Sequence, residues 1–398
     1  MKKINYGWLI CAASALLLFC TGGLGVTGFS AYQPYLINIG GLSNTQSSTV
    51  ILFRTFFILI GMLCANRLIE LFEIRRVVTV SLLICSVSFV LFGLSNGFTM
   101  YCFAAALMGF AVGFGGLISA SVLIARWFNE YRGFAIGVSM AATGLSALAA
   151  SPYITYVTEH YSLNRAFIIE GIFVFAVAIV VYAVIRSMPA CLDTTPVGAE
   201  TLDTDKTYAE KDAPKSLYIG MMIGIMLFGM PGNVFASHVS VIYSNSGYSS
   251  VDVATMVSLL GIALAIGKCV YGFISDKIGT YKASWLFYGM VLIGIGLTCL
   301  AGSGGRIVAY VAVLAAGFGF AVTTVSPAMY AATIATERTY GKTVSRFQIM
   351  SNIGALIFTT IPGIVADLTG SYIPAVIMMF VIAFISVLIL QIIYSRLQ

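Results

Sequence analysis

Long runs without a charged residue constrain this chain more than any other feature. No charge falls between Lys3 and Arg54, between Arg76 and Arg126, or between Arg132 and Glu159. A helix needs about 20 apolar residues to cross a bilayer, so the longest runs each hold two crossings. Only 9% of the residues are charged, against about 25% in soluble domains. This composition excludes a soluble enzyme, a nucleic-acid binder and a secreted disulfide scaffold.

Turn-forming residues divide the runs into twelve apolar segments, for example at Gly40-Gly41-Leu42-Ser43-Asn44 and Ser95-Asn96-Gly97. Because the segments are long and continuously apolar, whereas membrane barrels alternate apolar and polar residues, we predict helices. The expected fold is an all-α membrane protein with twelve transmembrane helices. The predicted spans are 8–34, 46–66, 75–94, 98–125, 133–157, 165–186, 217–243, 251–275, 282–301, 306–333, 342–366 and 372–394.

The basic residues predict the orientation in the membrane. With both termini inside, the cytoplasmic ends and loops hold 17 of the 21 lysines and arginines. Cytoplasmic loops are enriched in these residues, so we expect a multi-pass plasma-membrane protein with cytoplasmic termini. The apolar run after Lys3 is too long for a signal peptide and is interpreted as the first helix.

A polar stretch divides the chain into halves. Residues 188–216 carry six acids, three lysines and three prolines. Such a segment cannot bury a core, so we predict a cytoplasmic linker. An N-terminal six-helix bundle is expected at 1–187, and a C-terminal six-helix bundle at 217–398.

The two halves also share a weak internal repeat. Glu70 follows the second span and lies 206 residues before Asp276, which follows the eighth. Arg132-Gly133 lies 208 residues before Tyr340-Gly341. A nearly constant offset close to half the chain length indicates duplication of a six-span unit.

Over its whole length the chain resembles the major facilitator superfamily. The segment Gly272–Lys282 fits a loop motif of that family, in which Gly is followed after three residues by Asp-Lys and then by Gly. The first-half copy departs from it at Leu71 and Glu73. The family uses these loops as cytoplasmic latches. The resemblance implies this role for Gly272, Asp276, Lys277, Gly279, Glu70 and Arg75.

Within the superfamily, the chain is most similar to the branch of monocarboxylate porters and oxalate/formate antiporters. The residues that carry this similarity are Tyr6-Gly7-Trp8, Arg126-Trp127-Phe128, Arg132–Gly137, Asn164–Phe167, Ser237-His238, Pro362-Gly363 and Asp367–Tyr372. The resemblance implies two pseudo-symmetric bundles that alternate access to a midplane site. It implies no cofactor.

Three charged residues inside the spans are candidates for chemistry, because a charge at a helix centre costs about 2.5–3.5 kcal/mol. By resemblance, Lys268 occupies the position of a substrate-binding Arg; alternatively, its long side chain reaches the cytoplasmic interface. Arg54, about 12 Å from the outer end of its helix, faces either the cavity or carbonyls of a neighbouring helix. Glu170 is interpreted as an interfacial carboxylate near Arg165, in preference to a proton-coupling group.

Two deep cations without a central carboxylate predict an electropositive cavity that attracts an anion. His238 either binds substrate or a proton, or is a neutral packing residue. Polar and aromatic residues complete the expected substrate site. They are Asn233, Tyr32, Tyr35, Tyr330, Ser326 and Asn352.

Glycines four residues apart predict close helix contacts at Gly109/Gly113 and at Gly133/Gly137. The eight cysteines lack paired spacing and are interpreted as packing residues. The sequence shows no metal-ligand or catalytic motif, so neither a metal site nor an enzyme is expected.

We therefore predict a secondary active transporter for a small organic anion, with a monocarboxylate as the preferred candidate. Proton symport and anion exchange both stay open. Efflux of hydrophobic or drug-like compounds is the alternative, and a non-transporting nutrient sensor is a weaker one. The expected partners are the substrate, membrane lipids and, for symport, protons. We expect a monomer and no nucleic acid.

Overall fold

The computed structural model describes residues 6–128, 132–189, 197, 214–301 and 304–396. These residues form helices joined by short turns, and their one extended contact is a bridge between Phe128 and Val197. The predicted all-α membrane fold is confirmed. Eleven helices in the described ranges are long and apolar enough to cross a membrane, and α11 (Thr280–Thr298) takes the place of the remaining predicted span.

The chain divides into two compact units. The first comprises Met1–Leu42 with Val50–Thr204, and the second comprises Ser43–Thr49 with Asp205–Gln398. The first six residues of α3 (Asn44–Leu71) therefore group with the second unit, while the rest of that helix belongs to the first. The predicted linker at 188–216 lies largely outside the described residues, so its limits and those of the two bundles stay predictions.

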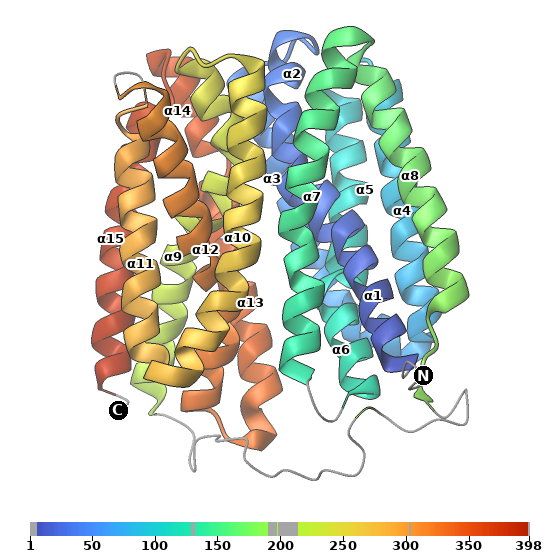
Figure 1. The fold of residues 1–398 in the computed structure, drawn as a ribbon, viewed down its shortest axis with the longest axis vertical. Helices are drawn as coiled ribbons and strands as arrows, with labels where there is room; N and C mark the ends of the chain where they lie inside the picture. The colour runs from blue at the N-terminus through green and yellow to red at the C-terminus, as the bar shows by residue number, and fades with distance from the viewer. Residues whose placement is uncertain (1–5, 129–131, 190–196, 198–213, 302–303, 397–398) are drawn as a thin grey trace. The chain divides into compact units, whose positions relative to one another are not determined.

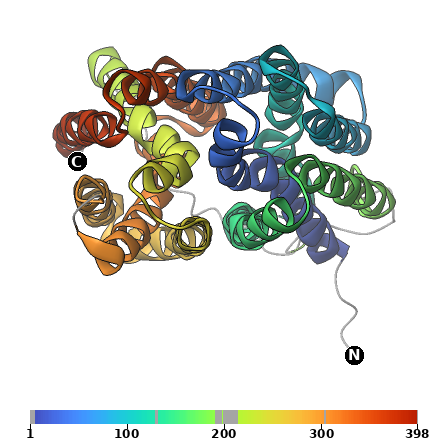
Figure 2. The ribbon, with the colours of Figure 1, turned by 90° about the horizontal axis from the view of Figure 1, so that it is seen from above.

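The first unit holds six spans among its described residues. Helices α4 and α8 pack along each other, as do α4 and α5 (Figure 1). Seen along their axes in Figure 2, these helices stand close to parallel. The elements are α1 (Tyr6–Leu18), η1 (Phe19–Thr27), η2 (Gly28–Tyr32), α2 (Gln33–Asn38), α3, α4 (Ile74–Leu94), α5 (Phe98–Gly115), α6 (Leu117–Trp127), α7 (Arg132–His160) and α8 (Leu163–Val184).

The second unit repeats this arrangement in its described part. Helices α11 and α12 pack together, α10 packs on α12, and α9 packs on α13 and α15. The bounds are α9 (Lys215–Asn245), α10 (Ser250–Ile278), α11, α12 (Gly305–Ile334), α13 (Glu337–Phe358), α14 (Ile361–Thr369) and α15 (Ile373–Ser395).

The sequence predicts one regular α-helix for the first span, but the structure interrupts it. Phe19–Thr27 forms a π-helix and Gly28–Tyr32 a 3₁₀ turn before α2 resumes. The segment contains Gly22, Gly23, Gly25 and Gly28, and glycine lowers helix propensity. A Cβ at Gly23 would collide with Ser146 of α7, so close packing also favours glycine there. Such π segments occur frequently at functional sites.

The helix contacts repeat between the units at the predicted offset. Cβ atoms added to Gly61 and Gly109 would meet the carbonyls of Phe110 and Arg54. Those added to Gly267 and Gly317 would meet the carbonyls of Phe318 and Leu260. The matching residues are 206 or 208 positions apart, which confirms the pseudo-symmetry expected from duplication.

The predicted close contact at Gly109 and Gly113 is confirmed, since both glycines touch the backbone of α3. The prediction for the second glycine pair is wrong at Gly137, where an added Cβ would meet nothing within 4 Å. The spacing alone does not say whether a helix face has a neighbour. The side-chain surroundings of Gly133 lie outside the described part.

Candidate functional site

Arg54 is the buried cation of the first unit. It lies on α3 about 15 Å from the start of the helix and is only 2% exposed. Its Nη1 donates a hydrogen bond of 3.1 Å to the Gly25 carbonyl in η1, and the guanidinium lies 5.1 Å from the centre of the Phe29 ring. Its buried Nε has no hydrogen-bond partner. The guanidinium thus meets one helix carbonyl and keeps an N–H without an acceptor.

Tyr32 and Arg54 meet at the same aromatic ring. The Phe29 ring, beneath the guanidinium, lies 5.8 Å from the ring of Tyr32, and Tyr32 stacks on Phe167 at 3.8 Å. Phe92 joins both Phe29 and Phe167. These four rings form an aromatic cluster in the core of the first unit. Two of the predicted site residues are therefore brought together.

Glu170 corrects the expectation of an interfacial carboxylate. It lies on α8 with its side chain turned into the bundle, where it is 4% exposed. Arg165 instead lies over the ring of Tyr161. The Tyr32 hydroxyl interacts with the Glu170 carboxyl, but the pair falls short of hydrogen-bond geometry. The sequence does not reveal this burial, because Glu170 is close to the end of its helix and position along a helix does not show which face a residue occupies.

Lys268 is the buried cation of the second unit. It lies on α10, which continues ten residues further to Ile278, and is 7% exposed. Its side chain is therefore covered by protein at about 15 Å from the helix end. This burial disfavours the alternative in which Lys268 reaches the aqueous interface.

His238 is fully buried on α9 and bonded through both ring nitrogens. Nδ1 lies 3.0 Å from the Val234 carbonyl, which can only accept, so Nδ1 carries the proton. Nε2 lies 3.1 Å from the hydroxyl of Ser48, the fifth residue of α3, which belongs to the same unit. In a neutral imidazole, Ser48 donates to Nε2. This arrangement favours the packing interpretation of His238.

The first turn of α3 is also held by Asp367. The two carboxylate oxygens of Asp367 accept from the backbone N–H groups of Asn44 and Thr45, at 3.2 and 2.8 Å, and from the side-chain amide of Asn44. Tyr372 donates to the Asn44 side chain at 3.0 Å. The segment Asp367–Tyr372, which carried part of the family resemblance, thus satisfies the first N–H groups of a helix.

The other polar candidates of the second unit are distributed along several helices. Asn233 on α9 donates to the Gly229 carbonyl at 3.3 Å and to Ser351 of α13 at 3.2 Å. Asn352, also on α13, donates to the Gln348 carbonyl at 2.9 Å. Ser326 is buried on α12. Their predicted contact with substrate stays a prediction.

Tyr330 lies in a buried chain of hydroxyl groups. Its hydroxyl donates to Ser284 at 3.0 Å and lies 3.0 Å from the hydroxyl of Tyr288, while Tyr271 lies 2.8 Å from Ser284. These residues tie α10, α11 and α12 together inside the second unit. Tyr35 of the first unit is half-buried, and its hydroxyl lies 3.5 Å from Glu159.

The latch residues lie at helix ends. Arg75 donates from Nε to the Tyr182 carbonyl at 2.9 Å and lies over the Tyr182 ring, so it attaches α4 to α8. Lys277 lies over the ring of Phe273, and Gly279 has φ +86° between α10 and α11. Gly272 has open space around its Cα, and Glu70 is exposed. The Asp276 side chain lies outside the described part of the chain.

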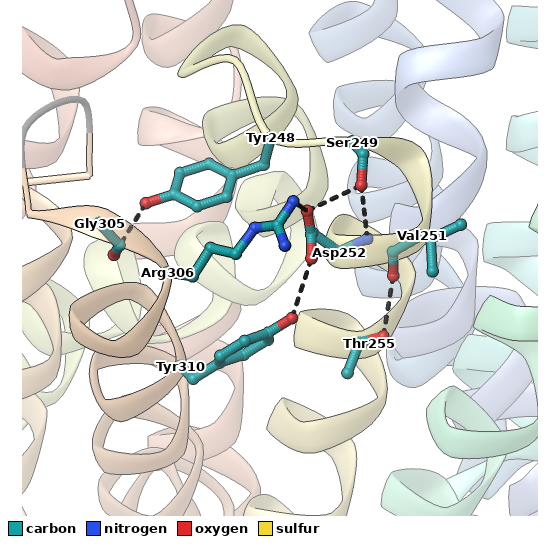
Figure 3. Close-up of polar contacts among 8 residues, drawn as sticks. All are labelled: Tyr248, Ser249, Val251, Asp252, Thr255, Gly305, Arg306 and Tyr310. Atoms are coloured by element: carbon teal, nitrogen blue, oxygen red, sulfur yellow. Dashed lines mark hydrogen bonds and ion pairs between the residues drawn. The ribbon is translucent and has the colours of Figure 1, made fainter.

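A polar cluster that was not predicted from the sequence lies at the start of α10 (Figure 3). Asp252 forms an ion pair of 3.1 Å with Arg306, accepts from Tyr310 at 3.1 Å and from the Ser249 hydroxyl at 2.7 Å. Tyr248 donates to the Gly305 carbonyl at 3.2 Å, and burial with the nearby Asp252 raises the pKa of its hydroxyl. The cluster joins the start of α10 to the start of α12. The Ser-x-x-Asp spacing at 249–252 was the available signal.

The aromatic motif residues at the ends of the first-unit helices also meet. Tyr6 donates to the Val184 carbonyl at 2.6 Å, and the Trp127 indole donates to the Arg186 carbonyl at 3.0 Å. The rings of Tyr6 and Trp127 lie 5.3 Å apart. Both side chains therefore satisfy carbonyls at the end of α8 that have no partner within the helix. Their role at this end is structural.

A match to a family model shows to which protein family the chain belongs. The model described as "Major Facilitator Superfamily" matches residues 15–359 and 221–397. The chain belongs to the Major Facilitator Superfamily. Members of this superfamily are multi-pass membrane transporters of small molecules and not enzymes.

Among curated proteins, the transporter is 25% identical over 246 residues to the uncharacterized MFS-type transporter YhjX of Escherichia coli, covering 59% of this chain and 58% of that one. It is 26% identical over 198 residues to the oxalate:formate antiporter of Oxalobacter formigenes, covering 48% and 45%. It is 19% identical over 252 residues to monocarboxylate transporter 13 of Rattus norvegicus, covering 63% and 56%. The chain spans about half the length of the curated relatives it matches.

Solved structures show the same fold at low identity. The D-xylose–proton symporter matches with a TM-score of 0.76 at 14% identity, covering 97% of each chain. A bacterial homolog of the human lysosomal transporter Spinster matches with a TM-score of 0.70 at 16% identity, covering 100% of this chain and 97% of that one. These likenesses concern the fold alone.

Proposed function

We propose that this transporter moves a small organic anion, with a monocarboxylate as the preferred substrate. The observation that carries the proposal is Arg54, a guanidinium buried on α3 whose Nε–H lacks an acceptor. A buried charged donor without an acceptor is costly, by about 1–3 kcal/mol or more. A carboxylate is the acceptor that matches a guanidinium best, because both are planar and form charge-assisted hydrogen bonds.

The contacts of Arg54 place its positive charge close to a polar backbone group without cancelling the charge. The Gly25 carbonyl accepts one hydrogen bond and the Phe29 ring lies beneath the guanidinium, but neither group carries a negative charge. The single ion pair among the described residues joins Arg306 to Asp252, far along the chain from Arg54. The positive potential around Arg54 therefore favours an anion.

Lys268 supports the same sign of substrate from the second unit. It is buried at depth on α10, which a lysine tolerates only when its ammonium is surrounded by acceptors or serves a function. The names of three relatives agree with the proposal, since one is an oxalate:formate antiporter and two are monocarboxylate transporters. Lysine lacks the fork of arginine, so Lys268 would bind a carboxylate as a point charge.

A carrier of hydrophobic cations is the second candidate, and Glu170 favours it. A buried carboxylate beside aromatic rings is the arrangement that would attract an organic cation. The two candidates differ in the charge of the transported molecule.

Counterflow in proteoliposomes separates the two. Purified protein is reconstituted in vesicles loaded with unlabelled solute, and uptake of the labelled solute is followed for formate, oxalate and lactate, for tetraphenylphosphonium, and for a neutral sugar. We expect saturable counterflow of at least one carboxylate. Counterflow of tetraphenylphosphonium alone would replace the proposal with the cation carrier.

The proposed location is the plasma membrane, with one chain as the transport unit and both termini in the cytoplasm. The two pseudo-symmetric units that the superfamily uses are both present in one chain. Labelling of single introduced cysteines at residue 43 and residue 279 by an impermeant maleimide in intact cells tests the orientation. Only the cysteine at residue 43 should react.

A further inference from the structure

The first unit buries a second charged group, which the proposed function does not use. The Glu170 carboxyl is 4% exposed, and neither of its oxygens has a hydrogen-bond partner. The hydroxyl of Tyr32, which is fully buried, also lacks one. Buried polar atoms are nearly always hydrogen-bonded, so these three atoms, which belong to two side chains that interact, require an explanation.

Glu170 lines a pocket of about 270 Å³ that opens at the surface of the unit, where the lining residues Ile169 and Phe173 are exposed. The walls are aromatic or aliphatic and come from η1, α7 and α8, with Phe19, Leu24, Tyr153, Ile169 and Phe173 beside the carboxyl. The Phe19 and Phe173 rings meet edge to face at 6.2 Å. The pocket therefore offers one acid and almost no other polar group.

No cation compensates the carboxyl within the described residues. The titratable groups that interact with Glu170 are Tyr32 from η2, Tyr153 from α7 and Cys20 from η1. Helix α4, which packs along α8, contributes Cys85 next to Cys20, and its Ser86 bonds to the Gly171 carbonyl. All of these groups are neutral donors or thiols. A carboxylate would stand alone in a medium of low dielectric constant.

We propose that Glu170 is a proton-binding site of the transporter. A carboxylate oxygen of Glu170 accepts a proton from hydronium: one O–H bond forms on the carboxyl, one O–H bond of hydronium breaks, and a water molecule is released. The reverse transfer to water restores the carboxylate. The neutral acid removes the cost of a bare charge and gives the carboxyl a donor of its own. The Tyr32 hydroxyl is placed to be its partner.

The same geometry couples the proton to the anion, and this step rests on the proposed function. Tyr32 stacks in the aromatic cluster whose Phe29 lies beneath Arg54. Arg54 and Glu170 form no ion pair, but a charge acts over a longer range in a medium of low dielectric constant. A carboxylate at Glu170 would therefore lower the positive potential at Arg54, whereas the neutral acid leaves that potential intact. Protonation of Glu170 therefore strengthens anion binding, and release of the proton weakens it. This ordering produces symport of an anion with a proton.

Infrared difference spectroscopy of the purified, reconstituted full-length protein tests the proton site without reference to transport. The pH-difference spectrum should contain a carboxylic-acid carbonyl band that disappears in Glu170→Gln. The band should persist in Glu159→Gln, which removes an exposed acid of α7, and in Glu170→Asp. A band that survives in Glu170→Gln would overturn the proton site. So would binding of tetraphenylphosphonium to the wild type that Glu170→Gln abolishes.

Uptake of labelled formate and lactate with and without an inward proton gradient tests the coupling. In the wild type and in Glu159→Gln, the gradient should raise accumulation at least about tenfold. In Glu170→Gln the response to the gradient should vanish while counterflow persists, and Glu170→Asp should restore it. Gradient-driven accumulation that persists in Glu170→Gln would overturn the coupling. The wild type could transport neither anion and still show the infrared band that is absent from Glu170→Gln. In that case the proposed function fails while the proton site stands.

Discussion

In the first unit the carbonyl of Arg54 lies against Gly109, and in the second the carbonyl of Leu260 lies against Gly317. The four residues occupy matching places, at offsets of 206 and 208. The same two helix pairs, α3 with α5 and α10 with α12, therefore meet at the same glycines. At one of these matching places the first unit carries the buried guanidinium of Arg54, and the second unit carries the apolar side chain of Leu260.

The comparison extends to the other buried charges. Lys268 on α10 matches Met62 on α3 at the offset of 206. Helix α8 carries the buried Glu170, whereas α15 has no charged residue between Ile373 and Ser395. Duplication kept the backbone contacts, because a glycine that touches a carbonyl tolerates no added atom. The buried charges differ, so the two units share their backbone contacts and not their charged residues.

The largest expected effect comes from removing the cations that break the symmetry. Arg54→Ala should lower anion uptake at least about 100-fold, since about 3 kcal/mol of charge-assisted bonding is lost and each 1.4 kcal/mol is worth tenfold. Lys268→Ala should also abolish uptake. Initial rates in proteoliposomes of matched protein content measure both.

The matching apolar positions supply the controls. Leu260→Ala and Met62→Ala should keep uptake within about threefold of the wild type, because neither position carries a charge. Arg54→Lys should retain part of the activity, since it keeps the charge and loses the planar fork. Normal uptake by both Arg54→Ala and Lys268→Ala would contradict an electropositive site.

The glycine contacts should respond alike in the two units. Gly109→Ala and Gly317→Ala force a Cβ against a carbonyl, at 2.7 Å from Leu260 in the second case. Each should lower the free energy of unfolding by about 1–3 kcal/mol, as overpacking does. Gly137→Ala, which adds a Cβ in open space, should leave it unchanged or higher. Unfolding in mixed micelles measures all three, and a stable Gly317→Ala would break the equivalence.

A smaller effect is expected from the hydroxyl chain of the second unit. Tyr330→Phe removes a donor that bonds to Ser284 at 3.0 Å in a site that is 1% exposed. The free energy of unfolding should fall by about 1 kcal/mol. If Tyr330 serves packing alone, the KM for the anion stays constant. A raised KM with unchanged stability would instead support the predicted substrate contact.

The smallest effect is expected at the exposed end of the polar cluster in Figure 3. Arg306 is 70% exposed in its ion pair with Asp252, so Arg306→Ala should cost less than about 1 kcal/mol. Asp252→Asn should cost more, because Asp252 also accepts from Tyr310 and Ser249. Equal losses of unfolding free energy would show that the ion pair dominates the cluster.

The sequence predicted the membrane fold because charge-free runs have few possible solutions in a bilayer. The repeat at 206 and 208 residues predicted the duplication, and the glycine contacts of α3 with α5 followed from spacing alone. The interruption at Phe19–Thr27 was not predicted, because a π-helix has the same apolar composition as an α-helix.

The sequence indicated which residues of the candidate site are buried and charged, but not how their side chains are arranged. Depth along a helix identified Arg54 and Lys268 as buried cations. The sequence does not show which way a side chain points around its helix, so it predicted an interfacial position for Glu170, which is in fact buried. The predicted substrate contact of Tyr330 stays a prediction. His238 is hydrogen-bonded to Ser48 and to Val234. The contact with Ser48 depends on which helices pack together, and this packing is seen only in the folded chain.

Recognition of negative charge is the central claim, and a pair of molecules of equal shape tests it most directly. Lactate and lactamide differ only in replacing a carboxylate by a neutral amide. Counterflow of labelled lactate by the wild-type transporter should be competed by unlabelled lactate and left unaffected by the same concentration of lactamide. Equal competition by lactamide, or counterflow of organic cations with none of any carboxylate, would contradict the account.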